Sequence, residues 1–261
     1  HVSGQGIVWR WLYAGATLVL PKEDFYQSIG EVSHVSLVPT QLQRWFDYLV
    51  EHPQSIYTQA ALLGGTQIPV KLTQALNELG IRSYSGYGMT EMASTAFAKQ
   101  SDGKIGVGQP LLGREFKLVN EEVWLKGAGL AMGYWRNGCV DPLTNVEGWF
   151  QTKDKGQWLD DELVIQGRLD NMFISGGENI QPEEIEKVIA QSDLVKQVFV
   201  LPKRDEEFGQ RPVALVEFHM PFNESAVESL NVFLQGRLER FKQPVAYYEL
   251  PQDLIQGAIK I

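Results

Sequence analysis

The stretch SGYGMTE, residues 85–91, combines two glycines with side chains that suit a nucleotide. Gly86 and Gly88 allow the backbone to turn sharply and to lie against a flat ligand, because neither carries a Cβ atom. The tyrosine between them offers a ring for stacking and a hydroxyl group. Thr90 can donate to a phosphate oxygen, and Glu91 can hold Mg2+, since hard cations choose oxygen ligands. Taken alone, the stretch also fits a plain turn in which Thr90 caps a helix.

Residues 81–84 are typical of a strand that leads directly into this stretch. Further apolar strands are predicted at residues 17–20, 35–38 and 60–63, so residues 1–110 alternate between strand and helix. This order predicts a largely parallel sheet, in which ligands bind beyond the carboxyl ends of the strands. Both the pair Gly64-Gly65 and the stretch at residues 85–91 follow such ends.

Helical periodicity predicts the two helices that connect these strands. Thr40 is expected to cap the first helix, and Pro69 to begin the second, which Gly80 ends. The apolar residues that recur at helical spacing are Leu42, Trp45, Phe46 and Leu49 in the first helix, and Leu72, Ala75, Leu76 and Leu79 in the second.

The rest of the chain changes character twice. Short strands at residues 115–119, 122–125 and 162–165 predict a small β subdomain. Beyond residue 171, a helix after Pro182 and strands at residues 197–201 and 213–218 predict a compact α+β domain. A last helix is expected to present Val227, Leu230, Phe233, Leu234, Leu238 and Phe241 on one face. We therefore predict three parts: a partial α/β subdomain (1–110), a β-barrel-like subdomain (111–169) and a small, mobile α+β domain (170–261).

Composition excludes several classes of protein. The 261 residues carry a net charge of −9, which argues against a general nucleic-acid surface. No apolar run approaches the roughly 20 residues of a membrane helix. The single cysteine, Cys139, lies in an expected polar turn, excludes internal disulfides and indicates a reducing, cytoplasmic compartment. The four histidines lack metal-ligand spacing. The chain begins at His1 within a pattern already under way, so we expect a piece of a longer protein.

A second pair of motifs lies downstream. Gly167-Arg168-Leu169-Asp170-Asn171 is followed by SGGENIQPEEIE at residues 175–186. With the stretch at residues 85–91, and in this order, these motifs resemble the adenylate-forming superfamily of acyl-CoA synthetases, luciferases and peptide-synthetase adenylation domains. The resemblance implies that ATP activates a carboxylate as its adenylate, that AMP is released, and that the acyl group passes to a thiol. It also implies Mg2+ as cofactor and CoA as co-substrate.

Further blocks extend the resemblance along nearly the whole chain. HVSG (1–4) is similar to the acyl-pocket segment, and LLGG (62–65) to the segment beside the adenine. EVWLKG (122–127) with GYW (133–135), and GWFQTKDKG (148–156), are similar to the blocks that follow. The nucleotide-binding residues that the resemblance implies are Gly64, Gly65, Ser85, Gly86, Tyr87, Gly88, Met89, Thr90, Asp154 and Arg168. The acyl-substrate residues that it implies are His1, Ser3, Gly4, Arg10 and Gly86.

The resemblance also implies individual roles. Asp154 accepts both ribose hydroxyls, a sound use of a carboxylate, and Arg168 adds a donor. Asp170 is the hinge between the two half-reactions, and Gly176-Gly177 forms a loop on the CoA side. Lys260 is the catalytic cation, together with Thr90 and the Mg2+ ligand Glu91.

Three departures from the family pattern stand out. Lys153 replaces a usual glycine beside Asp154, and Ile259 replaces the glycine before Lys260. The Ser/Thr/Gly-rich phosphate loop that the family places upstream of His1 is absent. Because that loop cradles the β- and γ-phosphates, we expect this chain by itself not to form an acyl-adenylate.

Within the superfamily, the motifs are closer to acyl-CoA ligases than to peptide-synthetase domains. The stretches at residues 1–6, 9–16, 38–42 and 167–173 resemble the ligases of o-succinylbenzoate, a substrate with two carboxylates of which one is activated. Arg10 lies between two tryptophans, where an unpaired guanidinium is unfavourable, so it is a candidate partner for the second carboxylate. The alternative is an arginine at a helix edge with its charge in solvent.

Two other functions remain open from the sequence. One is a different ligase, which acts on a fatty or aryl acid or loads a carrier protein. The other is a catalytically inactive module that binds a nucleotide or an acyl group, as the absent phosphate loop suggests. All of these readings predict small-molecule substrates and no nucleic-acid partner, and a homodimer is compatible with each.

Overall fold

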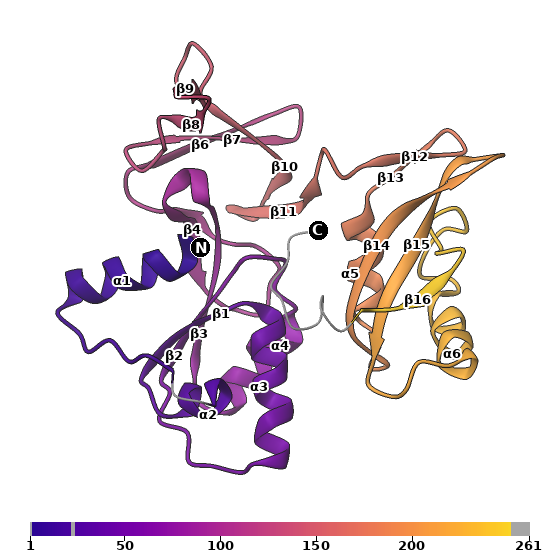
Figure 1. The fold of residues 1–261 in the computed structure, drawn as a ribbon, viewed down its shortest axis with the longest axis horizontal. Coiled ribbons are helices and arrows are strands. Elements are labelled where there is room, and N and C mark those ends of the chain that lie inside the picture. Colours follow the sequence, from indigo (N-terminus) through magenta and orange to yellow (C-terminus); the bar gives the residue numbers. More distant parts are fainter. Residues whose placement is uncertain (1, 22–23, 252–261) are drawn as a thin grey trace. The chain divides into compact units, whose positions relative to one another are not determined.

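The computed structural model of the chain describes residues 2–21 and 24–251, and it divides into two units. The first unit comprises residues 1–152 and 156–165, and the second comprises residues 153–155 and 166–261. Figure 1 labels the helices and strands of each unit. The strands β10 (Phe150–Leu159) and β11 (Glu162–Arg168) contribute residues to both units. The predicted division into three parts stays a prediction.

The first unit contains a five-stranded mixed sheet in the order β1-β2-β3-β4-β5. The first three strands are parallel, as predicted, and the last two are antiparallel to their neighbours. Helices supply the crossovers that parallel strands require. The elements are β1 (His34–Leu37), α3 (Pro39–Glu51), β2 (Ala60–Leu63), α4 (Val70–Glu78), β3 (Arg82–Met89), β4 (Ser94–Gln100) and β5 (Gln109–Pro110).

The predicted apolar faces of α3 and α4 pack on this sheet. Trp45 and Leu76 are fully buried in a core that also contains Leu63. Two details of the prediction are wrong. Leu79 is 46% exposed, because α4 has already ended at Glu78. Thr40 does not cap α3, which begins one residue earlier at a proline.

The amino-terminal part differs most from the prediction. Residues 17–20 form no strand, because β1 is the outermost strand of the sheet and the chain reaches it only at residue 34. Two unpredicted helices, α1 (Val2–Ala14) and α2 (Phe25–Gly30), precede β1. Asp24 caps α2, since its carboxylate accepts the amide protons of Tyr26 and Gln27.

A second sheet has the order β11-β10-β7-β6, with β6 (Arg114–Val119) and β7 (Glu122–Gly127) close to their predicted bounds. The strand β10 and the hairpin β8 (Gly133–Arg136) and β9 (Cys139–Pro142) are unpredicted. Cys139 therefore starts a strand and does not lie in a turn, and it is exposed. The apolar side chains that this sheet buries in the first unit include Val123, Leu125 and Leu163.

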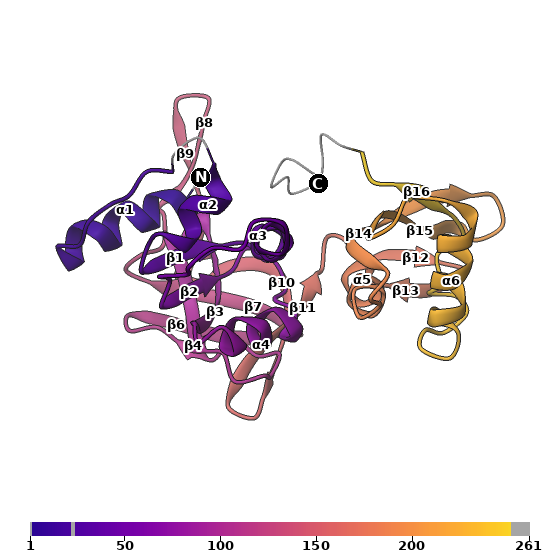
Figure 2. The same ribbon diagram turned by 90° about the horizontal axis from the view of Figure 1, so that it is seen from below.

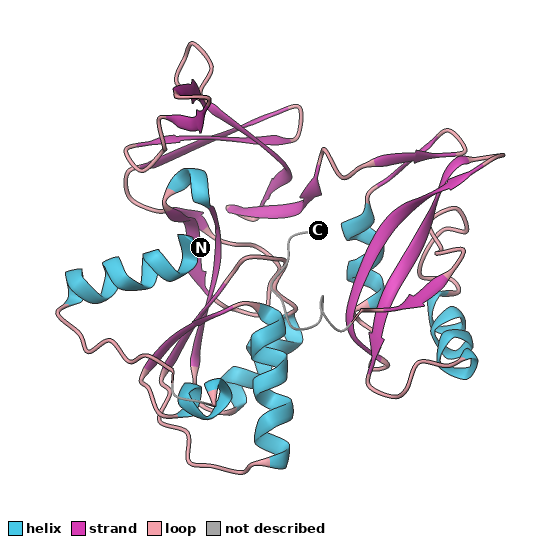
Figure 3. Ribbon diagram, viewed as in Figure 1, coloured by secondary structure: helices cyan, strands magenta, loops and turns pink. Residues whose placement is uncertain are grey.

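The second unit is a separate α+β structure, as predicted. Its elements are β12 (Phe173–Ser175), β13 (Glu178–Ile180), α5 (Pro182–Ile189), β14 (Val195–Asp205), β15 (Gly209–Phe218), α6 (Glu224–Leu234) and β16 (Tyr247–Glu249). Figures 2 and 3 show the two helices beside the three-stranded sheet β14-β15-β16, and one apolar core joins these elements.

The last helix is shorter than predicted. It ends at Leu234, and Gly236 adopts a φ of 74°, which leaves the helical region. Leu238 is still buried in the same core, so the apolar pattern was correct for burial but not for helix length. No helix in the described ranges combines the length and the apolar character that crossing a bilayer requires.

One carboxylate on α5, that of Glu186, predicts a pH effect on stability. Burial raises the pKa of Glu186 to about 7, although its Oε1 accepts the amide proton of Val200 at 2.7 Å. A raised pKa means that the folded state holds a proton that the unfolded state releases. Stability should therefore fall as pH rises from about 4.5 to 7.

We expect Glu186→Gln to remove this fall in stability at higher pH. The free energy of unfolding, measured in urea, should be compared between the variant and wild type. The difference in favour of the variant should grow by about 2 kcal/mol from pH 5 to pH 8. Glu228→Gln, at an exposed position of α6, is the matched control and should change stability little at either pH. A constant difference between Glu186→Gln and wild type across this range would contradict the prediction.

Candidate functional site

The glycine-rich stretch is extended and does not form the expected turn. Residues 85–89 are the second half of β3, which pairs with β2 on one side and with β4 on the other. A Cβ atom on Gly88 would overlap the carbonyl group of Ser94 on β4, so only glycine fits there. The pairing shifts register between Tyr87 and Gly88, which places a bulge at the end of the strand.

The structure brings the first glycine pair to this strand, as predicted from the parallel order. Gly64 follows β2, and a Cβ atom on it would lie 3.1 Å from the carbonyl oxygen of Gly86. The close approach leaves an edge of bare backbone at the carboxyl ends of two adjacent parallel strands. Such an edge can accommodate a flat base. Gly65 next to it has a φ of 94°.

Three side chains of the stretch make contacts inside the first unit. Ser85 is buried, and its hydroxyl lies 2.9 Å from the hydroxyl of Ser101. The Tyr87 ring lies 6.0 Å from that of Phe97, at a tilt of 56°. Met89 packs against the core of the second sheet. Ser85 therefore contributes to the stretch mainly through its backbone.

Thr90 and Glu91 lie on a single turn of 3₁₀ helix, η1 (Thr90–Met92), directly after β3. The turn lacks a side-chain cap, so the expectation that Thr90 caps a longer helix is wrong. Met92 is fully buried and packs in the apolar core of the first unit, which fixes the position of the turn. The Glu91 carboxylate accepts a hydrogen bond from the Tyr134 hydroxyl at 2.6 Å.

The residues predicted to line an acyl pocket, Ser3, Gly4 and Arg10, lie on the helix α1, which has no buried residue. Arg10 is exposed, and its Nε donates to the carbonyl oxygen of Gly6 on the same helix at 2.9 Å. The neighbouring Trp9 is itself 69% exposed, so Arg10 does not lie in the buried apolar setting that was expected, although partial burial lowers the pKa of its guanidinium. The role of Arg10 stays a prediction. His1 lies outside the described residues.

In the second unit, Asp154 and Arg168 lie side by side, and their role at a ribose stays a prediction. Asp154 is 8% exposed, and its Oδ1 accepts from Nη1 of Arg168 at 3.1 Å. Another edge of the guanidinium forms a bidentate pair with the Asp170 carboxylate. Nε donates to Oδ1 at 2.8 Å, and Nη2 donates to Oδ2 at 2.7 Å. This pair holds the pKa of Asp170 below its usual value and raises the pKa of Arg168.

The departure at Lys153 has a structural consequence. Its φ is 64°, in the left-handed region that favours glycine. The family glycine at this position therefore matches the backbone conformation, and lysine occupies it with some strain. The Lys153 carbonyl oxygen accepts the amide proton of Leu169 at 2.7 Å, which ties this segment to the predicted hinge.

The predicted CoA-side loop is a two-residue hairpin turn between β12 and β13. Gly176 and Gly177 have φ values of 58° and 91°, the positive values that such turns require. The Gly176 amide donates to the carbonyl oxygen of Phe208 at 3.0 Å, and a Cβ atom on Gly176 would strike the Phe208 ring. Lys260, the predicted catalytic cation, lies outside the described residues.

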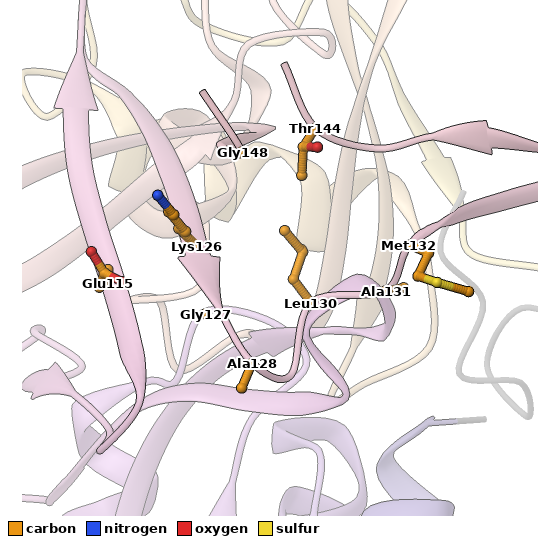
Figure 4. A pocket seen from close by; sticks show the side chains of 9 residues that line it. All are labelled: Glu115, Lys126, Gly127, Ala128, Leu130, Ala131, Met132, Thr144 and Gly148. Carbon is orange, nitrogen blue, oxygen red and sulfur yellow. The ribbon is translucent and has the colours of Figure 1, made fainter. Parts of the chain in front are cut away.

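A pocket of about 470 Å3 lies in the first unit, on the second sheet (Figure 4). Glu115 and Lys126 face each other on its strands β6 and β7. The glycine-rich stretch and Glu91 do not line it, so it is not the predicted nucleotide site. The residues that line it are Glu115, Lys126, Gly127, Ala128, Leu130, Ala131, Met132, Thr144 and Gly148.

The described part of the chain holds no cluster of three or more histidine, cysteine, aspartate or glutamate side chains that could bind a metal by itself. A cation at Glu91 would need further oxygen ligands from a substrate. Mg2+ sites in phosphate-transfer enzymes have this composition, with one or two carboxylates and substrate phosphates. The residues present thus fit a cation that arrives with a nucleotide.

Sequence comparison places these features in a known context. The profile of the AMP-binding enzyme family matches residues 1–135, and that of the AMP-binding enzyme C-terminal domain matches residues 184–254. The chain is 68% identical to the 2-succinylbenzoate–CoA ligase of Haemophilus influenzae, and 52% identical to that of Escherichia coli. Both alignments cover the whole chain, but only 58% and 56% of the two relatives.

Solved structures that resemble this chain come from the same kind of ligase as its sequence relatives. A variant of E. coli MenE with bound OSB-AMS matches with a TM-score of 0.88 and 51% identity, over 97% of this chain and 55% of that one. The o-succinylbenzoate–CoA synthetase of Bacillus subtilis, in complex with ATP and a magnesium ion, matches with a TM-score of 0.78 and 27% identity. This second match covers 96% of the chain and 56% of the synthetase. The partial adenylate-forming fold predicted from the sequence is confirmed.

Proposed function

Because this chain belongs to the AMP-binding enzyme family, we propose that it is part of an AMP-forming ligase that joins o-succinylbenzoate to CoA in menaquinone biosynthesis. The observation that carries the proposal is the 68% identity, along the entire chain, with a protein named as the ligase of this acid. Two features, each taken within its own unit, support it. The first unit contains bare backbone at Gly64 and Gly86 together with Glu91, and the second unit contains the pair Asp154–Arg168.

In the proposed first half-reaction, a carboxylate oxygen of the acid attacks the α-phosphorus of ATP. An acyl-adenylate forms, and pyrophosphate leaves. The backbone at Gly64 and Gly86 borders the adenine, Thr90 positions a phosphate, and Asp154 accepts the ribose hydroxyls. Glu91 would hold Mg2+, which would neutralise phosphate charge when bound. Positioning and charge stabilisation carry most of such a transfer.

In the second half-reaction, the CoA sulfur attacks the acyl carbon of the adenylate, and AMP leaves. The small domain turns about Asp170 between the two steps, and the loop at Gly176-Gly177 then borders the CoA. The hydrogen bonds around residues 153–171 support a hinge of few torsions, because they fix the backbone on both sides of Asp170.

Pyrophosphate release by the full-length protein over a panel of acids tests the proposal. We expect o-succinylbenzoate to give the highest kcat/KM. A preference for fatty acids, for other aryl acids or for a carrier protein would indicate one of the other ligases. Nucleotide binding without release for any acid would indicate the inactive module.

Asp154→Asn should weaken AMP binding by about 1.5–3 kcal/mol, because charge-assisted bonds to the ribose hydroxyls become neutral ones. Calorimetry with AMP and with 2′,3′-dideoxy-AMP checks this, since the second ligand lacks both hydroxyls and should be affected far less. Asp160→Asn, at an exposed turn position, is the matched control. Equal losses for both ligands would remove Asp154 from the ribose.

The proposal includes a cytoplasmic location, which the single cysteine supports. It also includes a homodimer. Sedimentation of the full-length protein tests the second point, and a monomer at micromolar concentration would contradict it.

A further inference from the structure

Tyr134 contacts the proposed metal ligand but has no role in the function proposed above. It lies on β8, within the block Gly133-Tyr134-Trp135. Its hydroxyl donates to Oε1 of Glu91 at 2.6 Å, across 43 positions of sequence. This distance is typical of a charge-assisted bond from a hydroxyl to a carboxylate, which is stronger than a neutral one. The contact lies wholly within the first unit.

The segment that leads to β8 also holds the backbone of Glu91. Ala131, which is labelled in Figure 4, follows β7 and precedes β8 in the chain, and it donates its amide proton to the Glu91 carbonyl oxygen at 2.8 Å. Next to it, Nη2 of Arg114 donates to the Met92 carbonyl oxygen at 3.3 Å. The turn η1 is therefore fixed through its backbone as well as through the Glu91 side chain.

These contacts leave one carboxylate oxygen for another ligand. Oε1 accepts from Tyr134, whereas Oε2 of Glu91 has no hydrogen-bond partner within residues 2–21 and 24–251. A glutamate on a short surface turn otherwise samples several rotamers, and ordering it on binding costs entropy. A phenol that holds Oε1 removes much of this freedom in advance. Groups that orient a metal ligand in this way affect metal affinity strongly.

We propose that Tyr134 is a positioning residue that holds the Glu91 carboxylate so that Oε2 can ligate the cation that accompanies ATP. The inference rests on the proposed function of Glu91 as the metal ligand. It assigns to the block at residues 133–135 a role in metal binding, in addition to its place in the hairpin β8–β9.

The test uses Tyr134→Phe in the full-length protein, which removes only the hydroxyl. Mn2+ serves as the probe, and the electron paramagnetic resonance signal of free Mn2+ reports binding in the presence of ATP. We expect about tenfold weaker Mn2+ binding. AMP binding without metal, measured by calorimetry, should stay unchanged. Tyr57→Phe, at a 62% exposed tyrosine of the same unit, should alter neither quantity.

Glu91→Gln separates the inference from the proposed function. If Glu91→Gln weakens Mn2+ binding but Tyr134→Phe leaves it unchanged or tightens it, the positioning role is wrong. If Glu91→Gln has no effect, the metal role of Glu91 is wrong, and the inference is overturned with it. In the Glu91→Gln background, Tyr134→Phe should cause no further loss, because both act through one carboxylate. A melting curve confirms that each variant is folded at the assay temperature.

Discussion

Alanine in place of Lys260 should slow the proposed adenylate formation by the full-length protein about 10²–10³-fold, while the proposed CoA transfer from a supplied acyl-adenylate continues. The family resemblance implies that the Lys260 ammonium stabilises negative charge that develops only when pyrophosphate leaves. Binding energy that is available only in that transition state raises the rate of that step alone. Pyrophosphate release and thioester formation, measured as separate half-reactions, check the expectation.

Two controls make this result interpretable. Lys260→Arg keeps the charge and should recover part of the first step. Lys104→Ala removes an exposed lysine of the first unit and should leave both steps intact. If Lys260→Ala slowed both half-reactions equally, Lys260 would be a folding or general binding residue. The departure at Ile259 would then have moved the catalytic cation to another position.

Helical and strand periodicity predicted most of the fold because the core is organised by repeating apolar faces. Leu42 and Trp45 recur at helical spacing and are fully buried, and Ile185 and Ile189 behave in the same way. Residues 17–20 have an apolar composition as well, but a strand also needs a neighbour with free backbone groups. The local sequence contains no information about which strand ends the sheet.

The glycine-rich stretch shows a second limit. Its composition suggested a turn, because glycine is most often needed where φ is positive. Gly88 is needed for a different reason, the close approach of the β4 backbone at Ser94. That approach depends on pairing between segments, so the local pattern could not predict the backbone conformation of the stretch, and the ligand-facing role of its residues stays a prediction.

The side-chain contacts within each unit were predictable to different extents. Asp154 and Arg168 were assigned to one ribose from the family resemblance, and the structure places them 3.1 Å apart. The replacement of glycine by Lys153 could have predicted the positive φ there, since the family residue type indicates it. The contact from Tyr134 to Glu91 could not be predicted, because it joins two blocks through the path of an unpredicted hairpin.

The region around Asp170 leads to the second large effect. Its carboxylate pairs with Arg168, and the Asn171 amide donates to the Arg168 carbonyl oxygen at 3.3 Å, which closes a turn through Asp170. Both members of the ion pair are substantially exposed, so the pair itself is worth at most about 1 kcal/mol. The torsions of Asp170 therefore matter more to the proposed hinge than its charge does.

Asp170→Pro in the full-length protein should spare the proposed pyrophosphate release but block the proposed transfer of the acyl group to CoA. Proline fixes φ near −65° and pushes Leu169 toward extended conformations, so the backbone can no longer change between two arrangements. Asp170→Ala is the matched variant, because it deletes the carboxylate and leaves the torsions free, and it should retain both steps. If Asp170 only closes a turn, Asp170→Pro lowers the melting temperature and both half-reactions decline together. Intact CoA transfer by Asp170→Pro would instead place the hinge elsewhere. Since the amide of Leu169 is tied to Lys153 and Asn171 contacts Glu183, few other torsions near residue 170 are free to take its place.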